Sequence, residues 1–340
     1  MKKVLFATTA LVATAGVAAA DVTFSGYGRF GAVYNSDQSG RANANRSAEV
    51  RAARAALASA TTTAERNTAQ TTLDAAIAAA SQAGSSTDVA SRFRLQADVS
   101  TETDAGVGFN ARMRIQVEEN ATNDSNGIRF GMTYGNLAMN VGNINGVIES
   151  TPNLYLSTKS AGMGLEGNGF HSLAVNNANG FFGWTAYSSG GIGAFNGVEV
   201  IYSASGLRLH AHSTEDSYAV GGSYAVAGYT FAAGYEEFDN ATDDSILLVT
   251  VGGTIGAANV SLAYGETDIG NNSEDKYTLA GGYDIGAATN VYGFVATEDA
   301  GEAFGLGVSH DLGGSASFEA GYTRTAAKTD ILSAGIFFSF

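Results

Sequence analysis

The sequence predicts an all-β protein, a sixteen-stranded antiparallel transmembrane β-barrel. Three observations predict it: apolar and polar residues alternate in many short segments, those segments number sixteen, and glycine is abundant while proline is nearly absent. The 340 residues include 44 Gly, 1 Pro and no Cys, whereas soluble chains average roughly 7% Gly and about 5% Pro. Such a length suits one large barrel as well as two ordinary domains.

Composition also excludes several classes of protein. A mean hydropathy of +0.01 fits neither a helical membrane protein nor a disordered chain. The absence of cysteine excludes thiol catalysis and Cys-ligated metal sites. A net charge of −15 argues against a nucleic-acid partner, because phosphate binding needs a basic surface. No nucleophile-elbow or P-loop motif occurs, so we expect neither enzymatic activity nor a cofactor.

The first element is a predicted signal peptide at residues 1–20. Lys2 and Lys3 give it a basic start, Val4–Val17 is apolar, and Ala18–Ala20 fits a small-residue cleavage site. The alternative, a transmembrane helix, would need a longer apolar stretch. The barrel is therefore predicted to occupy residues 21–340 of an exported chain, in the outer membrane of a Gram-negative bacterium.

Segments of period two follow. Within 107–118, Met113 and Ile115 alternate with Arg112 and Arg114, so one face of this strand is apolar and the other charged. A lipid-facing outside and a water-filled inside require this pattern, although a soluble β-sandwich also alternates. The predicted strands are 22–34, 91–101, 107–118, 127–134, 136–142, 197–204, 206–214, 216–226, 228–238, 245–255, 257–267, 276–286, 289–298, 303–312, 316–326 and 330–340. Sixteen is an even number, as closure requires, and leaves an aqueous channel.

Two long segments interrupt the strands. Residues 36–90 hold 14 Ala between Ala48 and Ser81 without Gly or Pro, which predicts two helices broken near Thr61–Thr63. This Ala-rich first extracellular loop could cap the pore, contact a neighbouring subunit or be a tolerated surface insertion. Residues 143–196 are rich in Gly, Asn and Ser, and a loop of this length is usually functional.

The cations gather at one side of the predicted barrel. Of the 16 that follow residue 20, eleven precede residue 130. Six lie opposite the apolar face of the first four strands and are predicted to point into the lumen: Arg29, Arg92, Arg94, Arg112, Arg114 and Arg129. Guanidiniums stay charged and repel one another, so a dry core would avoid the cluster whereas a pore can use it. The alternative is that these arginines only pair with lumen acids and fill space.

Three motifs carry a family resemblance. The start Asp21–Gly31, the turn Thr101–Gly106 and the terminal Phe340 resemble Gram-negative general porins, in particular the α-proteobacterial Rhodobacter and Paracoccus type. The terminal Phe, preceded by alternating apolar residues, also resembles the signature by which outer-membrane barrels are assembled. The resemblance implies a homotrimeric diffusion channel, narrowed by a third loop that folds into the barrel.

The resemblance also implies a pore constriction. Its inward-folded loop would start near Gly142–Ser150, and Glu149 and Glu166 are the acids of 143–196. Asp98 and Glu118 are predicted by parity to face the lumen as further acids. A positive wall facing an acidic loop sets up a transverse field, which orients polar solutes and penalises apolar ones.

These features predict passive passage of small hydrophilic solutes and ions through a water-filled pore. From residue 197 onward there are 19 acids and four cations, which predicts weak cation selectivity. The alternatives are a channel with a preferred solute and a closed surface barrel with an adhesion or structural role. A barrel-embedded hydrolase is a third, because His210 and His212 alternate on one strand face. The same pair could bind a metal, but no third ligand has convincing spacing.

Further partners are predicted on the outside. Acidic turns such as Asp239–Asp244 could hold Ca²⁺ or bridge lipopolysaccharide, although no twelve-residue calcium-loop pattern occurs. On the outward face of the first strand, Gly26, Gly28 and Ala32 interrupt larger residues. Small residues there would let a neighbouring subunit approach, or would only ease the curvature of the barrel.

Overall fold

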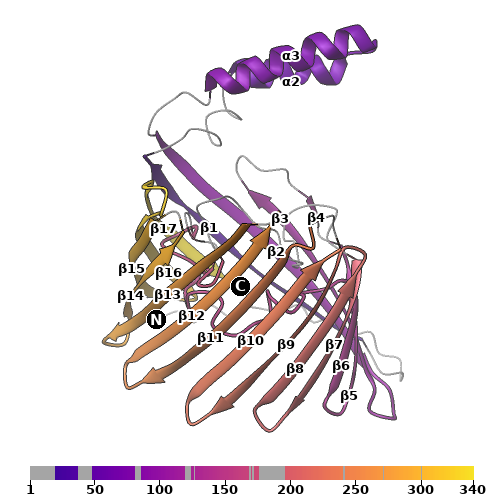
Figure 1. Cartoon of the computed structure of the whole chain (residues 1–340), viewed down its shortest axis with the longest axis vertical. Coiled ribbons are helices and arrows are strands. Elements are labelled where there is room, and N and C mark those ends of the chain that lie inside the picture. The colour runs from indigo at the N-terminus through magenta and orange to yellow at the C-terminus, as the bar shows by residue number, and fades with distance from the viewer. Residues whose placement is uncertain are drawn as a thin grey trace, which may run out of the picture.

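The computed structural model is a closed β-barrel with a helical hairpin beyond one of its ends (Figure 1). The residues it describes are 20–36, 48–80, 86–118, 124–125, 127–167, 170, 172–175, 196–239, 242–270, 272–299 and 301–340. The predicted signal peptide up to residue 19, and residues 176–195 of the predicted inward loop, lie outside the described residues.

The strands follow one another around the barrel in chain order. They are β1 Asp21–Asn35, β2 Ser86–Glu102, β3 Gly108–Glu118, β4 Asp124–Ser125, β5 Arg129–Tyr134, β6 Leu137–Asn143, β7 Asn196–Ala204, β8 Leu207–Thr214, β9 Ser217–Val226, β10 Tyr229–Phe238, β11 Ser245–Ile255, β12 Ala258–Ile269, β13 Asn272–Ile285, β14 Thr289–Glu298, β15 Gly301–Gly313, β16 Ala316–Arg324 and β17 Asp330–Ser339. Each pairs antiparallel with its neighbours, and β1 pairs with both β2 and β17, which closes the sheet. The two residues of β4 pair with β3 as β5 does, so β4 and β5 form one barrel strand. The predicted sixteen-stranded barrel is therefore confirmed.

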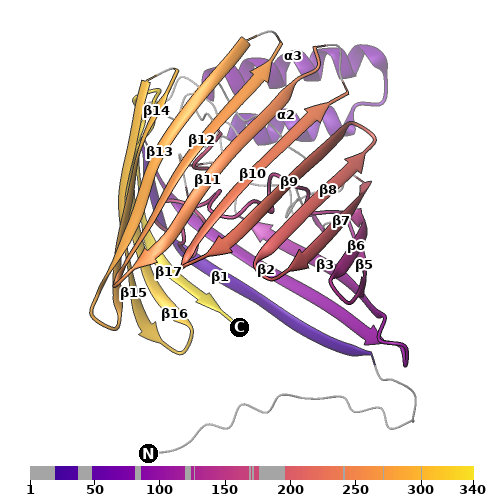
Figure 2. The same ribbon diagram turned by 60° about the horizontal axis from the view of Figure 1, so that its bottom comes forward.

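The two ends of the barrel differ in their connections. At one end, short turns such as Ser205–Gly206 and Ala227–Gly228 place both residues at positive φ, the backbone that matches the twist of a hairpin. Longer connections, including the one that carries the helices, lie at the other end. Figure 2 shows β17 finishing on the side of the short turns, away from the helices.

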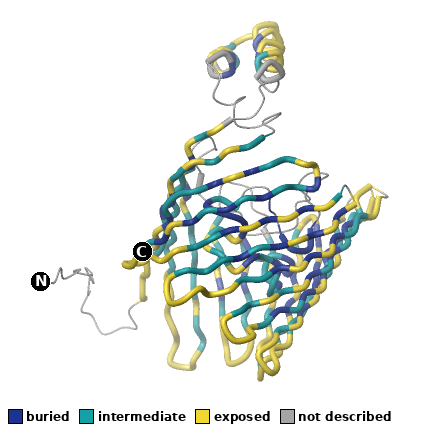
Figure 3. Tube along the Cα trace, turned by 90° about the vertical axis from the view of Figure 1, so that its left-hand side faces the viewer, coloured by how far each residue is buried: buried dark blue, intermediate teal, exposed yellow. Residues whose placement is uncertain are grey.

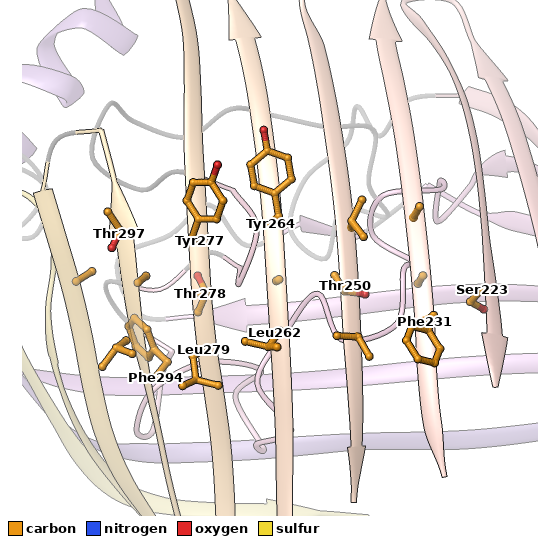
Figure 4. A pocket seen from close by; sticks show the side chains of 18 of the residues that line it. Ser223, Phe231, Thr250, Leu262, Tyr264, Tyr277, Thr278, Leu279, Phe294 and Thr297 are labelled. Carbon is orange, nitrogen blue, oxygen red and sulfur yellow. The ribbon is translucent and has the colours of Figure 1, made fainter. Parts of the chain in front are cut away.

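Burial alternates along the strands because one face looks out and the other looks in. Figure 3 shows this alternation as buried and exposed residues in turn. Figure 4 looks onto the outer face, where Tyr264 and Tyr277 lie side by side with ring centroids 4.9 Å apart. Below them lie apolar side chains such as Leu262 and Leu279, which border a shallow outer hollow of about 1280 Å³.

Two rows of tyrosines border this apolar outer face. In three strands they are six positions apart, as Tyr218 and Tyr224, Tyr229 and Tyr235, and Tyr277 and Tyr283. Six positions span roughly 20 Å of strand. Aromatic rows on either side of an apolar band are typical of outer-membrane barrels, where the rings sit at the two interfaces with water.

The closing strand pair explains the glycines of β1. A Cβ on Gly28 would meet the ring of Phe338 at 2.4 Å, and one on Gly26 would meet the ring of Phe340 at 2.7 Å. The C-terminal rings of this same chain thus cover both glycines, as aromatic residues do in strand pairs that contain glycine. The space beside Gly26 and Gly28 is therefore filled by rings of this chain itself, while a subunit contact at this face stays a prediction.

The helical hairpin consists of α2 Ala48–Ser59 and α3 Thr63–Ala80. Val50, Ala53 and Leu73 form its buried core. The break between the helices is fixed by a capping box, in which Glu65 Oε2 accepts from the backbone N of Thr62 at 2.9 Å and the N–H of Glu65 donates to Thr62 Oγ1 at 3.2 Å. These hydrogen bonds lower the pKa of Glu65 to about 2. No described helix is long and apolar enough to span a membrane.

Candidate pore constriction

A loop that follows β6 folds back into the barrel and lies on its inner wall. Ile144, Val147 and Ile148 at its start are buried, as are Leu154, Leu165 and Leu173 further along. Ile148, Leu154 and Leu173 pack in one cluster with inward-facing residues such as Leu248, Ala280 and Phe294, and Leu165 packs in another with Ala90 and Phe337. We call the described residues between 144 and 175 the inner loop. Its apolar side is held on the wall, so the lumen beside it is narrowed by its remaining surface.

The start of the inner loop is held by a buried cluster on β7, β8 and β10. The backbone N–H groups of Gly146 and Val147 donate to Glu199 Oε2 at 3.0 Å and to His212 Nδ1 at 2.9 Å. Behind them, His210 Nε2 lies 3.0 Å from Glu199 Oε2, and His212 Nε2 lies 3.4 Å from Glu236 Oε1. All four side chains are nearly inaccessible to water. We call these four residues the loop clamp.

Further anchors follow the inner loop around the wall. Thr250 Oγ1 donates to the carbonyl of Pro152 at 2.6 Å, and the N–H of Gly164 donates to the Tyr292 hydroxyl at 3.2 Å. The N–H of Leu165 donates to Ser333 Oγ at 2.9 Å. These partners belong to β11, β14 and β17, so the inner loop runs along the wall from β8 to β17 and reaches β1.

Lys276 of β13 makes the last anchor. Its Nζ donates to the carbonyl of Val175 at 3.0 Å and lies 2.9 Å from Glu298 Oε1, and both side chains are 0% exposed. Desolvating two charges is costly, so such a pair persists only when it is well aligned and further hydrogen-bonded. The carbonyl of Val175 supplies that further bond, which ties the inner loop to the pair.

The predicted arginines lie together on the inner face of β1–β5. Strand register sets them in four rows across neighbouring strands. In the first two rows, Arg92 lies between Arg29 and Glu118, and Arg94 lies between Tyr27 and Gln116. In the other two, Gln96 lies opposite Arg114, and Arg112 lies between Asp98 and Arg129. We call the six arginines Arg29, Arg92, Arg94, Arg112, Arg114 and Arg129 the arginine wall. The strand pairing predicted from the alternation brings them side by side, although they span a hundred residues of sequence.

Each part of the arginine wall has polar partners. Arg112 Nε donates to Asp98 Oδ1 at 2.6 Å, and Arg92 pairs with Glu118. Arg94 donates twice to Gln116 Oε1, at 2.9 and 2.7 Å, and its guanidinium lies 5.0 Å from the ring centre of Tyr27. The side chains of Arg92 and Arg112 are 21% and 31% exposed. The wall is thus braced in place while part of its charge faces the lumen.

Arg29 joins the arginine wall to the inner loop. Its NH1 donates to the carbonyl of Leu165 at 3.2 Å, and its NH2 lies 3.7 Å from Glu166 Oε1 and 3.9 Å from Glu118 Oε1. The side chain is only 2% exposed. Arg29 therefore acts at the contact between wall and loop, and Glu166 brings a loop carboxylate to the edge of the arginine wall.

Nine of the ten residues predicted for the constriction lie in this assembly, and Glu149 lies apart from it. Its carboxylate accepts a hydrogen bond from the Tyr155 hydroxyl at 2.5 Å. Burial and the neighbouring carboxylate raise the pKa of Tyr155 well above its usual range. The backbone carbonyl of the next residue, Ser150, accepts a hydrogen bond from Arg208 of β8 at 3.1 Å. Glu149 therefore lies on the part of the inner loop that β8 holds.

The loop clamp and Lys276 were not predicted as functional residues. The alternation of His210 and His212 did place both on the inner face, which left a metal site and a barrel-embedded hydrolase as alternatives for this pair. Within the described ranges, no group of three or more His, Asp or Glu could hold a metal ion. In the turn proposed for Ca²⁺, Asp244 instead accepts from Gly270 N at 2.9 Å and from Thr242 Oγ1 at 2.6 Å.

Comparisons with known proteins agree with this architecture. A family model described as Gram-negative porin matches residues 7–330. A porin of Fuscovulum blasticum is 26% identical over 261 residues, which cover 68% of this chain and 84% of that protein. Two engineered variants of the Rhodopseudomonas blastica porin have TM-scores of 0.70 and 22% identity, and the match covers 94% of this chain and all of theirs.

Proposed function

The chain belongs to the Gram-negative porin family, and from that premise we propose that it is a general diffusion channel for small hydrophilic solutes and ions. Family and fold are those of a passive channel of the outer membrane rather than of an enzyme. The observation that carries the proposal is the arginine wall on the inner face of β1–β5, beside an inner loop that is anchored along the rest of the inner wall.

Selectivity in this proposal comes from fixed charge beside water. Arg92 and Arg112 keep 21% and 31% of their side-chain surface exposed. A passing solute can therefore contact their guanidinium groups while these groups remain partly hydrated. Asp98, Glu118 and Glu166 contact the same arginines and offset part of their charge. With 19 acids after residue 197, the proposed net preference is weakly for cations.

Export and assembly complete the proposal. Residues 1–20 are proposed to be a cleaved signal peptide, on the strength of their basic start and small-residue end. The resemblance supports a homotrimer that contacts lipopolysaccharide through its acidic outer rim. N-terminal sequencing of the purified barrel should begin at Asp21, and its detergent-corrected mass should be three times that of one chain.

Conductance in a planar bilayer tests the channel itself. Purified native protein should give large steps grouped in threes, and the conductance should rise almost linearly with salt concentration. In a salt gradient, the reversal potential should have the sign of a channel that is more permeable to cations than to anions. Folded, heat-modifiable protein that gives no steps would instead favour a closed barrel with an adhesion or structural role.

A further inference from the structure

A pocket of about 510 Å³ lies between the inner loop and the wall of β10–β13. It is on the opposite side of the barrel from the arginine wall. Thr151, residues 153–157 and Leu173 of the inner loop border it on one side. The wall contributes Thr230, Thr254, Asn259 and Ser261 together with the backbone of four glycines, Gly228, Gly252, Gly253 and Gly281. Its volume is in the range of small-molecule sites, roughly 300–1,000 Å³.

The lining of this pocket is polar but uncharged. No described residue that lines it carries a formal charge. Among the described residues, the side chains of Thr254, Asn259 and Ser261 have no hydrogen-bond partner in the protein. Hydroxyl and amide groups both donate and accept hydrogen bonds, so these three side chains leave both kinds of group open to a ligand.

Gly252 lets the inner loop approach the wall closely beside the pocket. A Cβ on Gly252 would come within 2.3 Å of Asn153 Oδ1 and 2.8 Å of Ser261 Oγ. Asn153 is itself held in place, because its Nδ2 donates to the carbonyl of Thr230 at 3.1 Å. The loop side of the pocket is therefore held to the strand side, which favours a ligand of defined shape over a loosely held one.

We propose that this pocket binds a neutral polyhydroxylated solute of the size of a monosaccharide as it passes through the pore. Each sugar hydroxyl both donates and accepts, as the lining groups do. A charged solute would lose hydration there without gaining a counter-charge, and an apolar one would leave the lining groups unpaired. The proposal rests on the proposed function for delivery of the solute, but binding itself does not require an ion current.

Equilibrium dialysis of radiolabelled glucose against the detergent-solubilised native barrel tests this proposal. Binding should saturate at one site per chain. Gluconate, the charged relative of glucose, should show no saturable binding. Ser261→Leu fills the pocket and should weaken glucose binding about tenfold or more, and Asn259→Asp, which keeps the size but adds charge, should weaken it as well.

Ser223→Leu is the matched control, because Ser223 also faces inward, on the neighbouring strand β9, but does not line the pocket. It should leave glucose binding unchanged. Non-saturable glucose uptake, equal binding of gluconate, or equal losses in Ser261→Leu and Ser223→Leu would overturn the proposal. Saturable glucose binding without an ion current would contradict the diffusion channel but not the binding pocket. A normal ion current without glucose binding would contradict the binding pocket but not the channel.

Discussion

The arginine wall and the anchored side of the inner loop carry charge in two different settings. On the arginine wall, Arg112 and Asp98 are 31% and 32% exposed, so their pair remains in contact with lumen water. Beneath the inner loop, Lys276 and Glu298 are 0% exposed. Both pairs lie on the inner face of the same barrel, yet one borders the water-filled pathway and the other is sealed from it.

This difference separates charges that act on solutes from charges that hold structure. A hydrated pair contributes little to stability, because water already solvates both partners. A sealed pair is costly to break, since the remaining partner is left charged and buried. The same residue types can therefore be assigned to permeation or to loop anchoring by their burial.

The largest effect is expected from Lys276→Met, which removes the ammonium group that pairs with Glu298 and anchors Val175. The free energy of unfolding should fall by about 3–5 kcal/mol, measured by denaturant titration of the barrel in micelles. Arg112→Met is the matched control on the arginine wall and should cost at most about 1 kcal/mol. Equal losses of unfolding free energy in the two variants would contradict the distinction between the sealed pair and the hydrated pair.

Substitutions in the loop clamp should have the next largest effect on the free energy of unfolding. His212→Phe removes the acceptor of the Val147 N–H and should cost about 1–3 kcal/mol, with added current noise as the start of the inner loop is released. His212→Gln retains an acceptor and should lose less. Identical losses from the two variants would argue that packing, and not the hydrogen bond, holds the loop there.

Tyr155 gives a smaller effect and a pH signature. Tyr155→Phe loses the bond to Glu149 and should cost about 1 kcal/mol. Because the folded pKa of Tyr155 is raised, its neutral form is favoured in the folded state. Its contribution should be complete below about pH 10, the unfolded value, and fall as the pH rises above it. The difference in unfolding free energy between wild type and Tyr155→Phe, compared at pH 8 and above pH 10, measures this; a constant difference would contradict it.

The smallest free-energy change concerns selectivity. Replacing Arg92, Arg94, Arg112 and Arg114 together with Gln should raise the cation-to-anion permeability ratio about twofold or more. Reversal potentials in a salt gradient measure this ratio. The matched change on the sealed side, Lys276→Gln, should leave the ratio unaltered in channels that still form.

Period-two alternation was enough to predict the barrel and the arginine wall. Because parity puts every second side chain inside, Arg92, Arg94, Arg112 and Arg114 could be assigned to the lumen before any pairing was known. The helix break near Thr61–Thr63 was also predictable, since composition and the capping box agree.

The path of the inner loop could not be predicted in this way. It is set by single contacts between residues far apart in sequence, such as Val147 with His212 and Leu165 with Ser333, and these have no periodicity. The sealing of His210 and His212 depends on that path, so from sequence alone they remained ordinary lumen residues. The aromatic cover over Gly26 and Gly28 was likewise not predictable, because the rings come from the other end of the chain.

The central claim is that the arginine wall borders the conducting water, while the side chains sealed beneath the inner loop, such as Thr250 and Lys276, do not. The chain has no cysteine, so Arg114→Cys and Thr250→Cys can each be probed alone with a negatively charged methanethiosulfonate during bilayer recording. Thr250 is 2% exposed beneath Pro152. We predict that Arg114→Cys reacts in the open channel and shifts the reversal potential toward cations, whereas Thr250→Cys reacts only after unfolding. An unreactive Arg114→Cys, or a reaction that leaves the reversal potential unchanged, would contradict the account.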